Sequence, residues 1–385
     1  MMGIYLDNAA TTRPSAHVLE VMRDASLNCW GNPSSIHAEG RAARKCVEKA
    51  RRQTAEALHA GEAREICFTS GGTEADNWAL RGVAHALRGQ GRHLITTQVE
   101  HHAVLHTAEM LAAEGFRVTY LPVDAEGRVS PADVAAAIEP DTILISVMAA
   151  NNELGTLQPI GEIGEIAHSQ GVLFHTDAVQ AVGAVLLSLS ELPVDLLSLS
   201  AHKLHGPKGI GALYIRRGTR IDGLLKGGQQ ERSLRPGTEA VAAIAGLGAA
   251  ITDAVETLPE RTARIAALRD ELWERLRDIP GIRRNSPERD VLPGLLNVCL
   301  PGCEGEALLL RLDLEDISAS SGSACTTGAP EPSHVLRAIG LDEEAVRSSI
   351  RFSIGDENTA EDIAIAAEAI RRISADLRRL RGWKG

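Results

Sequence analysis

Short apolar segments alternate with longer amphipathic segments from about residue 15 to about residue 255. Most of the short segments are apolar on both faces, as expected of strands that helices cover on each side. This alternation predicts a doubly wound α/β domain around a central, mostly parallel sheet. The predicted strands are residues 66–69, 93–97, 117–121, 142–148, 172–175, 196–200 and 211–215.

The pattern changes toward the end of the chain. One long helix is predicted from Ala240 toward Arg277, small and apolar at its start and amphipathic at its end, as in a helix that passes from one core into another. Later apolar runs predict a smaller α+β domain. We therefore predict a large domain of residues 15–257 and a small domain of residues 1–14 and 258–385, with the first dozen residues beside the small domain or over the cleft. The predicted elements of the small domain are strands at 295–300 and 348–353 and a closing helix at 360–380.

Composition narrows the classes of partner. The 385 residues carry a formal net charge of -11, which argues against a protein that binds nucleic acid through its phosphates. The N-terminus lacks a basic stretch followed by an apolar core, and the longest smooth apolar run, residues 240–251, is too short to span a bilayer. We expect a cytoplasmic enzyme that acts on small molecules or proteins, without nucleic acid or membrane partners.

An acid and an amine follow two neighbouring predicted strands. Asp177 comes just after one apolar run and Lys203 just after the next. Ligands of open α/β sheets bind at the carboxyl ends of strands, so both side chains should face one crevice. A pyridoxal cofactor needs such a pair, because the acid keeps the pyridine nitrogen protonated and the amine forms a Schiff base. The alternatives are an ordinary salt bridge between the two side chains and, for the cofactor anchor, Lys208 in the turn GPKG.

A glycine-rich turn offers a place for a phosphate. In TSGGTEADNWAL a strand runs into Gly71 and Gly72, and a helix begins near Thr73. Glycines let backbone amides approach an anion, and the helix N-terminus favours negative charge. Ser200 and His202, just before the lysine, can add donors. The alternative is a tight turn with a threonine cap.

Other polar residues follow predicted strands. His101 at a strand end can stack on a pyridine ring and shuttle a proton. Asn152 and Gln180 can hydrogen-bond the phenolic oxygen of the cofactor or the substrate. His102 and His106 lie one helical turn apart, as metal ligands can, but no third ligand has an obvious spacing, so we predict no metal site.

One cysteine differs from the other five in its surroundings. Cys325 lies in SASSGSACTTGAPEP, a run of small residues with no helical or strand periodicity. Such a loop should be mobile and exposed, which suits a nucleophile that enters a cleft and leaves with its cargo. Cys46 and Cys67 lie in predicted regular structure, whereas Cys299 and Cys303 flank a turn. No CxxC pair occurs, so reduced thiols are expected. The alternative is an incidental loop cysteine.

Taken together, these segments resemble the cysteine desulfurases of the NifS/IscS type, within the fold type I pyridoxal-phosphate enzymes. The resemblance covers nearly the whole chain, and its cysteine loop matches the group that reads SSGSAC. The segments that carry it are YLDNAATT, GNPSSIH, TSGGTEADN, EHHAVL, NNELG, HTDAVQ, SAHKLHGPKG, RPGTE, SSGSACTTG and IRFSIG.

The resemblance implies a role for each cofactor-binding residue. Lys203 would carry pyridoxal 5'-phosphate as a Schiff base, Asp177 would pair with its pyridine nitrogen and His101 would cover its ring. Thr238 would reach the phosphate of the cofactor in the partner subunit, which implies an obligate homodimer. Further contacts to the cofactor would come from Gly72, Thr73, Asn152, Gln180, Ser200 and His202.

The resemblance also implies the reaction. Arg351, with Asn32 nearby, would bind the carboxylate of L-cysteine through a charge-assisted fork. Lys203 would remove the Cα proton, and the thiolate of Cys325 would attack the sulfur of the substrate. The products would be L-alanine and a persulfide on Cys325, for delivery to an acceptor such as an iron–sulfur scaffold or a tRNA-thiolation relay.

Three other functions compete with this one. Selenocysteine lyases, kynureninases and aminotransferases share the fold type but need no mobile cysteine, so Cys325 discriminates against them. A non-catalytic sulfur carrier that retains the fold would not turn over cysteine. A P-loop nucleotide binder requires a lysine that SGGTE lacks.

Overall fold

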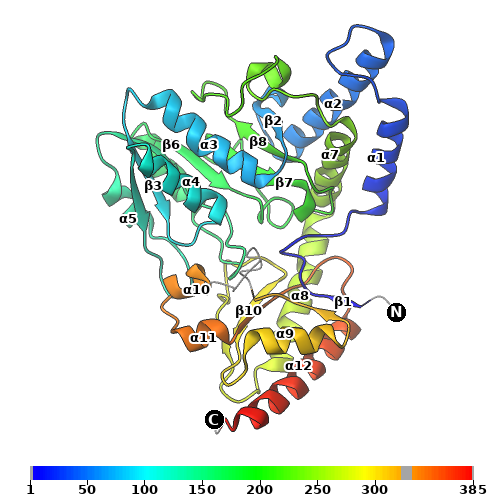
Figure 1. The fold of residues 1–385 in the computed structure, drawn as a ribbon, viewed down its shortest axis with the longest axis vertical. Coiled ribbons are helices and arrows are strands. Elements are labelled where there is room, and N and C mark those ends of the chain that lie inside the picture. The colour runs from blue at the N-terminus through cyan, green and yellow to red at the C-terminus, as the bar shows by residue number, and fades with distance from the viewer. Residues whose placement is uncertain (1–2, 322–331, 384–385) are drawn as a thin grey trace.

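The computed structural model describes residues 3–321 and 332–383. A larger α/β body and a smaller body lie one above the other in Figure 1, and the segment formed by α7 (Val241–Glu256) and α8 (Leu258–Leu276) runs between them. Cys325 lies outside the described residues.

A seven-stranded sheet forms the centre of the large domain, as predicted. The strand order is β2-β8-β7-β6-β5-β3-β4. Only β8 runs antiparallel to its neighbours, so the sheet is mostly parallel. Most of the predicted strand boundaries are met to the residue. In the order of the sheet, the strands are Ile66–Thr69, Gly211–Ile215, Leu196–Ser200, Leu173–Asp177, Thr142–Ser146, His93–Thr97 and Arg117–Leu121.

Each face of the sheet has its own core because successive strand residues point to opposite sides. Leu144 belongs to a cluster with α3 and α4, whereas its neighbour Ile145 belongs to a cluster with α2, α6 and α7. Both residues are fully buried, which explains why these strands read as continuous apolar runs. The helices of this domain are α1 (Ala16–Asn28), α2 (Ala38–Ala57), α3 (Gly72–Leu87), α4 (His102–Ala113), α5 (Pro131–Ala137), α6 (Ile160–Ser169) and α7 (Val241–Glu256).

The single helix predicted from residue 240 to 277 is wrong. The chain forms α7 and then α8 (Leu258–Leu276), which meet at Thr257 with a bend of 74°. Pro259 lies in the first turn of α8, where its missing N–H is tolerated but would break a continuous helix. Among residues 3–321 and 332–383, no single helix is long and apolar enough to cross a membrane; only this bent pair meets that test of length and composition.

The small domain packs helices against a three-stranded antiparallel sheet. Strand β10 lies between β9 and β12, and Leu272, Phe352 and Ile370 are fully buried in the shared core. The strands and the closing helix differ from the predicted boundaries by one residue at most, and the division at residues 14 and 257 stays a prediction. The elements are α8, β9 (Arg283–Arg284), β10 (Leu295–Cys299), α9 (Gly305–Asp313), α10 (His334–Ala338), α11 (Glu343–Arg347), β12 (Ser349–Ser353) and α12 (Ala360–Arg381).

Residues 4–13, which we call the N-terminal strap, connect the two domains. Strand β1 (Ile4–Tyr5) runs parallel to β11 (Ile317–Ser318), and Leu6 is buried in the core of the small domain. A few residues later, Ala9 belongs to the core of the large domain. The strap therefore lies both beside the small domain and over the junction.

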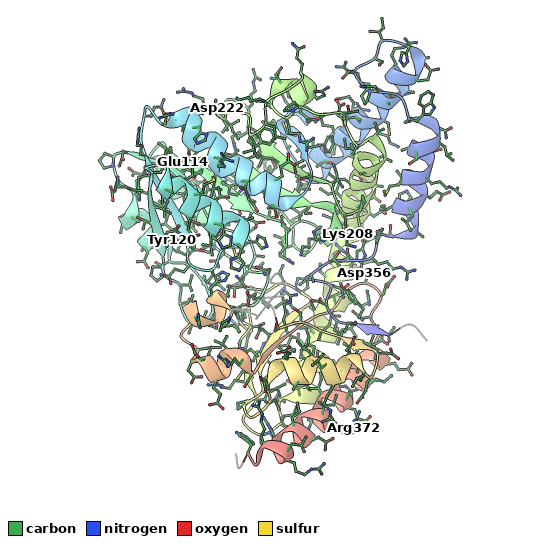
Figure 2. The ribbon with its side chains drawn as sticks, viewed as in Figure 1. Glu114, Tyr120, Lys208, Asp222, Asp356 and Arg372 are labelled. Carbon is green, nitrogen blue, oxygen red and sulfur yellow. The ribbon has the colours of Figure 1, made fainter. Side chains whose placement is uncertain are left out.

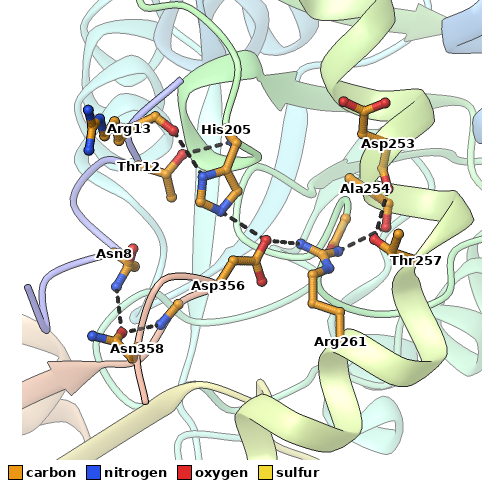
Figure 3. A network of polar contacts seen from close by, with 12 residues as sticks. Asn8, Thr12, Arg13, His205, Asp253, Ala254, Thr257, Arg261, Asp356 and Asn358 are labelled. Atoms are coloured by element: carbon orange, nitrogen blue, oxygen red, sulfur yellow. Dashed lines mark hydrogen bonds and ion pairs between the residues drawn. The ribbon is translucent and has the colours of Figure 1, made fainter. Parts of the chain in front are cut away.

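A polar network holds this junction together (Figure 3). The Nε2 atom of His205 lies 3.2 Å from the Asp356 carboxylate, which also lies 3.5 Å from Arg261 on α8. From the strap, Thr12 accepts a hydrogen bond from the backbone N–H of His205 at 2.8 Å. The pKa of His205 is raised by Asp356 and the backbone of Arg13 although burial lowers it. The turn just after Lys203 is thus tied to the strap and to the small domain.

Candidate active site

A cavity of about 400 Å³ lies at the carboxyl ends of β6 and β7, between the two domains and below the N-terminus of α3. Lys208, the alternative anchor, is exposed on the large domain and is not among the lining residues (Figure 2). The predicted site residues that line the cavity are Gly72, Thr73, His101, Asn152, Asp177, Gln180, Ser200, His202, Lys203 and Arg351.

Asp177 is the last residue of β6 and is almost completely buried. One of its carboxylate oxygens accepts the backbone N–H of Val179 at 2.9 Å. Burial raises the pKa of Asp177 to about 6, against the lowering effects of this hydrogen bond and of the positive charge of Lys203. A cationic group that enters the cavity would therefore stabilise the ionised form of Asp177.

Lys203 ends a short 3₁₀ turn, η2 (Ala201–Lys203), that follows β7. Its Nζ atom donates hydrogen bonds to two carbonyl oxygens of the N-terminal strap, at 2.5 Å from Ala9 and 2.9 Å from Ala10. Gln180 donates to the same Ala9 oxygen at 2.9 Å. The strap thus holds the amine through two carbonyl groups of residues that line the same cavity.

The N-terminus of α3 offers free amides at one end of the cavity. The helix begins at Gly72 without a side-chain cap, and Gly71 before it has φ of 156°, a conformation that favours glycine. A Cβ atom at Gly72 would lie 2.6 Å from a methyl carbon of Val179, so only glycine fits there without a shift. Glu74 in the first turn is neutralised by a bidentate contact with Arg235. An anion can therefore bind at this helix end.

His101 caps the N-terminus of α4 above the cavity. Its Nδ1 atom accepts the backbone N–H of Ala103 at 3.1 Å, which leaves the proton of the neutral ring on Nε2. Burial lowers the pKa of His101 to about 4, with a further contribution from Lys203 and from neighbouring histidines. The ring is therefore neutral at physiological pH.

Three more histidines adjoin this cap. The ring centroid of His102 lies 4.9 Å from that of His106 and 4.7 Å from that of His334. Within residues 3–321 and 332–383 no group of three or more His, Cys, Asp or Glu side chains has an arrangement that could hold a metal ion.

Two buried acids near Asp177 escaped the sequence analysis. Asp76 on α3 lines the cavity, and its Oδ1 atom has no hydrogen-bond partner among the described residues. Burial and then the charge of Asp177 raise its pKa well above the usual range. Burial also raises the pKa of Glu100 to about 8. Asp76 follows Gly72 by one helical turn, a spacing that signals its position near the cavity.

Arg351 on β12 lines the cavity from the side of the small domain. Its Nη2 atom lies 2.8 Å from Oδ1 of Asp7, and its Nη1 atom donates to the carbonyl oxygen of Asn152 at 2.9 Å. Asn32, expected beside Arg351, does not line the cavity and instead accepts the backbone N–H of Ser34. The partner that was missed is Asp7, although the motif LDNAATT signalled an acid near the cleft.

Thr238 is exposed and does not line the cavity of its own chain. Its predicted contact across a dimer stays a prediction.

The lining residues fit a flat aromatic phosphate in three respects. A helix N-terminus can hold the phosphate, a buried carboxylate can meet a protonated ring nitrogen, and the residue that carries the amine lines the same cavity. Asp76, whose Oδ1 atom lies 3.7 Å from Nε2 of His175, adds a further polar residue to the lining. Pyridoxal phosphate has this combination of groups.

Comparisons with known proteins agree with this geometry. The profile of the class-V aminotransferase family matches residues 4–365. The cysteine desulfurase IscS of Methanosarcina thermophila is 50% identical over 378 residues, which are 98% of this chain and 93% of that protein. The cysteine desulfurase IscS of Dictyoglomus turgidum is 48% identical and covers 99% of this chain and 97% of its own.

Solved structures give the same result. A NifS-like protein superposes with a TM-score of 0.92 at 40% identity, over 97% of this chain and all (100%) of that one. SspA in complex with cysteine superposes with a TM-score of 0.81 at 38% identity, over 92% of this chain and 100% of that one.

Proposed function

The chain belongs to the class-V aminotransferase family and, within it, to the cysteine desulfurases of the NifS/IscS type, and on this premise we propose its cofactor, its site residues and its reaction. The enzyme takes sulfur from L-cysteine with the help of pyridoxal 5'-phosphate, releases L-alanine and keeps the sulfur as a persulfide on Cys325. The observation that supports this most strongly is the single cavity shared by Asp177, Lys203 and Arg351.

Three groups of residues would hold the cofactor. The amides of Gly72 and Thr73, with Ser200 and His202, would bind its phosphate, and Lys203 would be its covalent anchor. Asn152 and Gln180 would hydrogen-bond its phenolic oxygen or the substrate. When bound, pyridoxal phosphate supplies an electron sink conjugated to the amino group of the substrate.

The residues of the chain would move or hold two protons. The carboxylate of Asp177 would keep the ring nitrogen protonated, because a cation beside this buried acid stabilises its ionised form. The Nζ atom of Lys203 would take the proton from Cα of the substrate as a general base. His101, neutral at physiological pH, would cover the ring without adding positive charge over it.

Arg351 would bind the carboxylate of the substrate and so orient the Cα–H bond. The thiolate of Cys325 would then attack the sulfur of L-cysteine. An S–S bond forms, the Cβ–S bond of the substrate breaks and its electron pair goes to Cβ. A proton added at Cβ completes the methyl group, and the return of the proton from Lys203 to Cα gives L-alanine. The persulfide sulfur would pass to an acceptor protein such as an iron–sulfur scaffold, and Thr238 would complete the site of a partner subunit in a homodimer.

Mass spectrometry after incubation with L-cysteine tests this proposal. We expect the holoenzyme to gain the mass of one sulfur atom, located on Cys325, and to release L-alanine in equal amount. Cys325→Ser should retain the absorbance of the bound cofactor but form no persulfide, whereas Cys303→Ser, a change at a buried thiol of the small domain, should still form one. Normal persulfide formation by Cys325→Ser would refute the assignment of the nucleophile.

A further inference from the structure

Arg351 is a buried cation with part of its hydrogen-bonding capacity already engaged. The residue is 2% exposed, and its two terminal nitrogens reach Asp7 and the carbonyl oxygen of Asn152. Its Nε atom is buried and has no hydrogen-bond partner in the described part of the chain. A guanidinium has five N–H donors in one plane, so the two engaged nitrogens fix the direction in which the remaining donors point.

Asp7 reaches Arg351 from behind the cavity wall. Leu6 is buried in the small domain, and alternation along the strap turns Asp7 to the opposite side, where the residue pairs with Ser353 of β12. Asp7 does not line the cavity itself. Any effect of Asp7 on a ligand therefore passes through Arg351.

We propose that Asp7 is a positioning residue that orients the guanidinium of Arg351 and offsets its charge, so that the substrate carboxylate is held in one direction but only moderately tightly. This inference rests on the proposed function, in which Arg351 binds the carboxylate of L-cysteine. Asp7 and the Asn152 carbonyl fix the plane of the guanidinium through its two terminal nitrogens. The negative charge of Asp7 competes with that of the ligand for one cation.

The other nearby carboxyl group is engaged elsewhere. Glu153 is buried, its Oε2 atom accepts a hydrogen bond from Ser333 at 2.5 Å, and burial raises its pKa although Arg351 lowers it. With Glu153 engaged by Ser333, Asp7 is the carboxylate in direct contact with Arg351 and sets the charge balance around it. A second carboxylate, from the substrate, then adds uncompensated negative charge, which favours prompt release of L-alanine.

Two variants separate orientation from charge. Asp7→Asn keeps an oxygen that can accept from Nη2 but removes the charge, so we expect L-alanine to bind the holoenzyme about tenfold more tightly, equivalent to ~1.4 kcal/mol. The KM for L-cysteine should fall by a similar factor, and kcat should not rise. Asp7→Ala also removes the acceptor, so the guanidinium can turn, and we expect binding at least tenfold weaker than in Asp7→Asn.

Isothermal titration of each holoenzyme with L-alanine, together with KM and kcat for L-cysteine, measures these changes. Glu357→Gln is the matched control, because it removes the same charge from an exposed acid at the domain junction and should leave both constants unchanged. Equal weakening in Asp7→Asn and Asp7→Ala, or unchanged binding in Asp7→Asn, would overturn the proposal. If Arg351→Leu binds L-alanine as tightly as the wild type does, the assignment of Arg351 to the substrate carboxylate is refuted instead.

Discussion

The two walls of the cavity hold buried charge in different ways. On the large-domain side, burial raises the pKa values of Asp76, which lines the cavity, and of Glu100, which does not, so the protonated form of both acids is favoured. On the small-domain wall, Arg351 meets Asp7 at 2.8 Å. A carboxyl group can escape the cost of burial by staying neutral, whereas a guanidinium cannot lose its proton and needs a counter-ion. On the large-domain side, protein stability should therefore depend on pH. On the small-domain side, activity should depend on substitutions that remove one member of the pair of Arg351 and Asp7.

The largest effect is expected where the large-domain wall supplies its amine. Lys203→Ala removes both the proposed anchor and the proposed base, so kcat/KM should fall at least about 10⁴-fold and the visible absorbance of the bound cofactor should disappear. Lys208→Ala, a change at an exposed lysine outside the cavity lining, should retain both. Cofactor absorbance that survives in Lys203→Ala but not in Lys208→Ala would move the anchor to Lys208.

A smaller loss of kcat/KM is expected from a substitution on the opposite wall of the cavity. Arg351→Leu removes the proposed carboxylate ligand and leaves Asp7 without its cation, so kcat/KM for L-cysteine should fall roughly 10²- to 10³-fold, mainly through KM. Steady-state kinetics measure the split between the two constants. Arg347→Leu, a change at an exposed arginine of α11, is the control and should have no effect on either constant. A fall confined to kcat would contradict a role in substrate binding.

The pH dependence of the stability of the apoprotein should show whether Glu100 keeps its proton in the folded state. The pKa of Glu100 is raised from 4.5 to about 8 on folding, so its contribution is fully present below pH 4.5 and is lost as pH rises through about 8. The free energy of unfolding should fall by a few kcal/mol across this window, and Glu100→Gln should flatten the fall. Denaturant titrations at several pH values measure it.

The control for this pH series is Glu56→Gln, which changes an exposed acid on α2. This variant should follow the wild-type curve. Identical curves for the wild type and Glu100→Gln would mean that Glu100 ionises in the folded protein much as it does in the unfolded chain.

The smallest effect is expected for an ion pair on the surface. Arg117 on β4 contacts Glu139 at 2.7 Å and Asp141 at 2.6 Å, distances as short as that between Arg351 and Asp7, but its side chain is 53% exposed. Arg117→Leu should change the free energy of unfolding by less than about 1 kcal/mol, as chemical denaturation would measure. A larger loss would show that burial does not explain the difference between the two pairs.

The large-domain wall could be predicted from sequence because each of its parts is local. A strand end followed at once by Asp177 or Lys203 puts both the position and the chemistry into a few consecutive residues. The bend at Thr257 was missed because the apolar pattern continues through it, and only Pro259 signals the break.

The small-domain wall was predicted only in part, because its pairing joins residues far apart in the chain. Arg351 was recognised through its motif, but its partner Asp7 comes from the opposite end of the sequence, and no local pattern connects the two. Asn32 was expected in the same place and lies elsewhere in the single chain.

The N-terminal strap has a consequence for biosynthesis. Ile4 pairs with Ile317 and Asp7 with Ser353, so β1 and the residues after it have no strand partner until β11 and β12 have been synthesised. The large domain can begin to fold while translation continues, whereas the pair of Asp7 and Arg351 must wait for β12. Nascent chains that stop short of β12 lack Arg351 and cannot pair it with Asp7, so binding of the amino acid can arise only after β12 has been made.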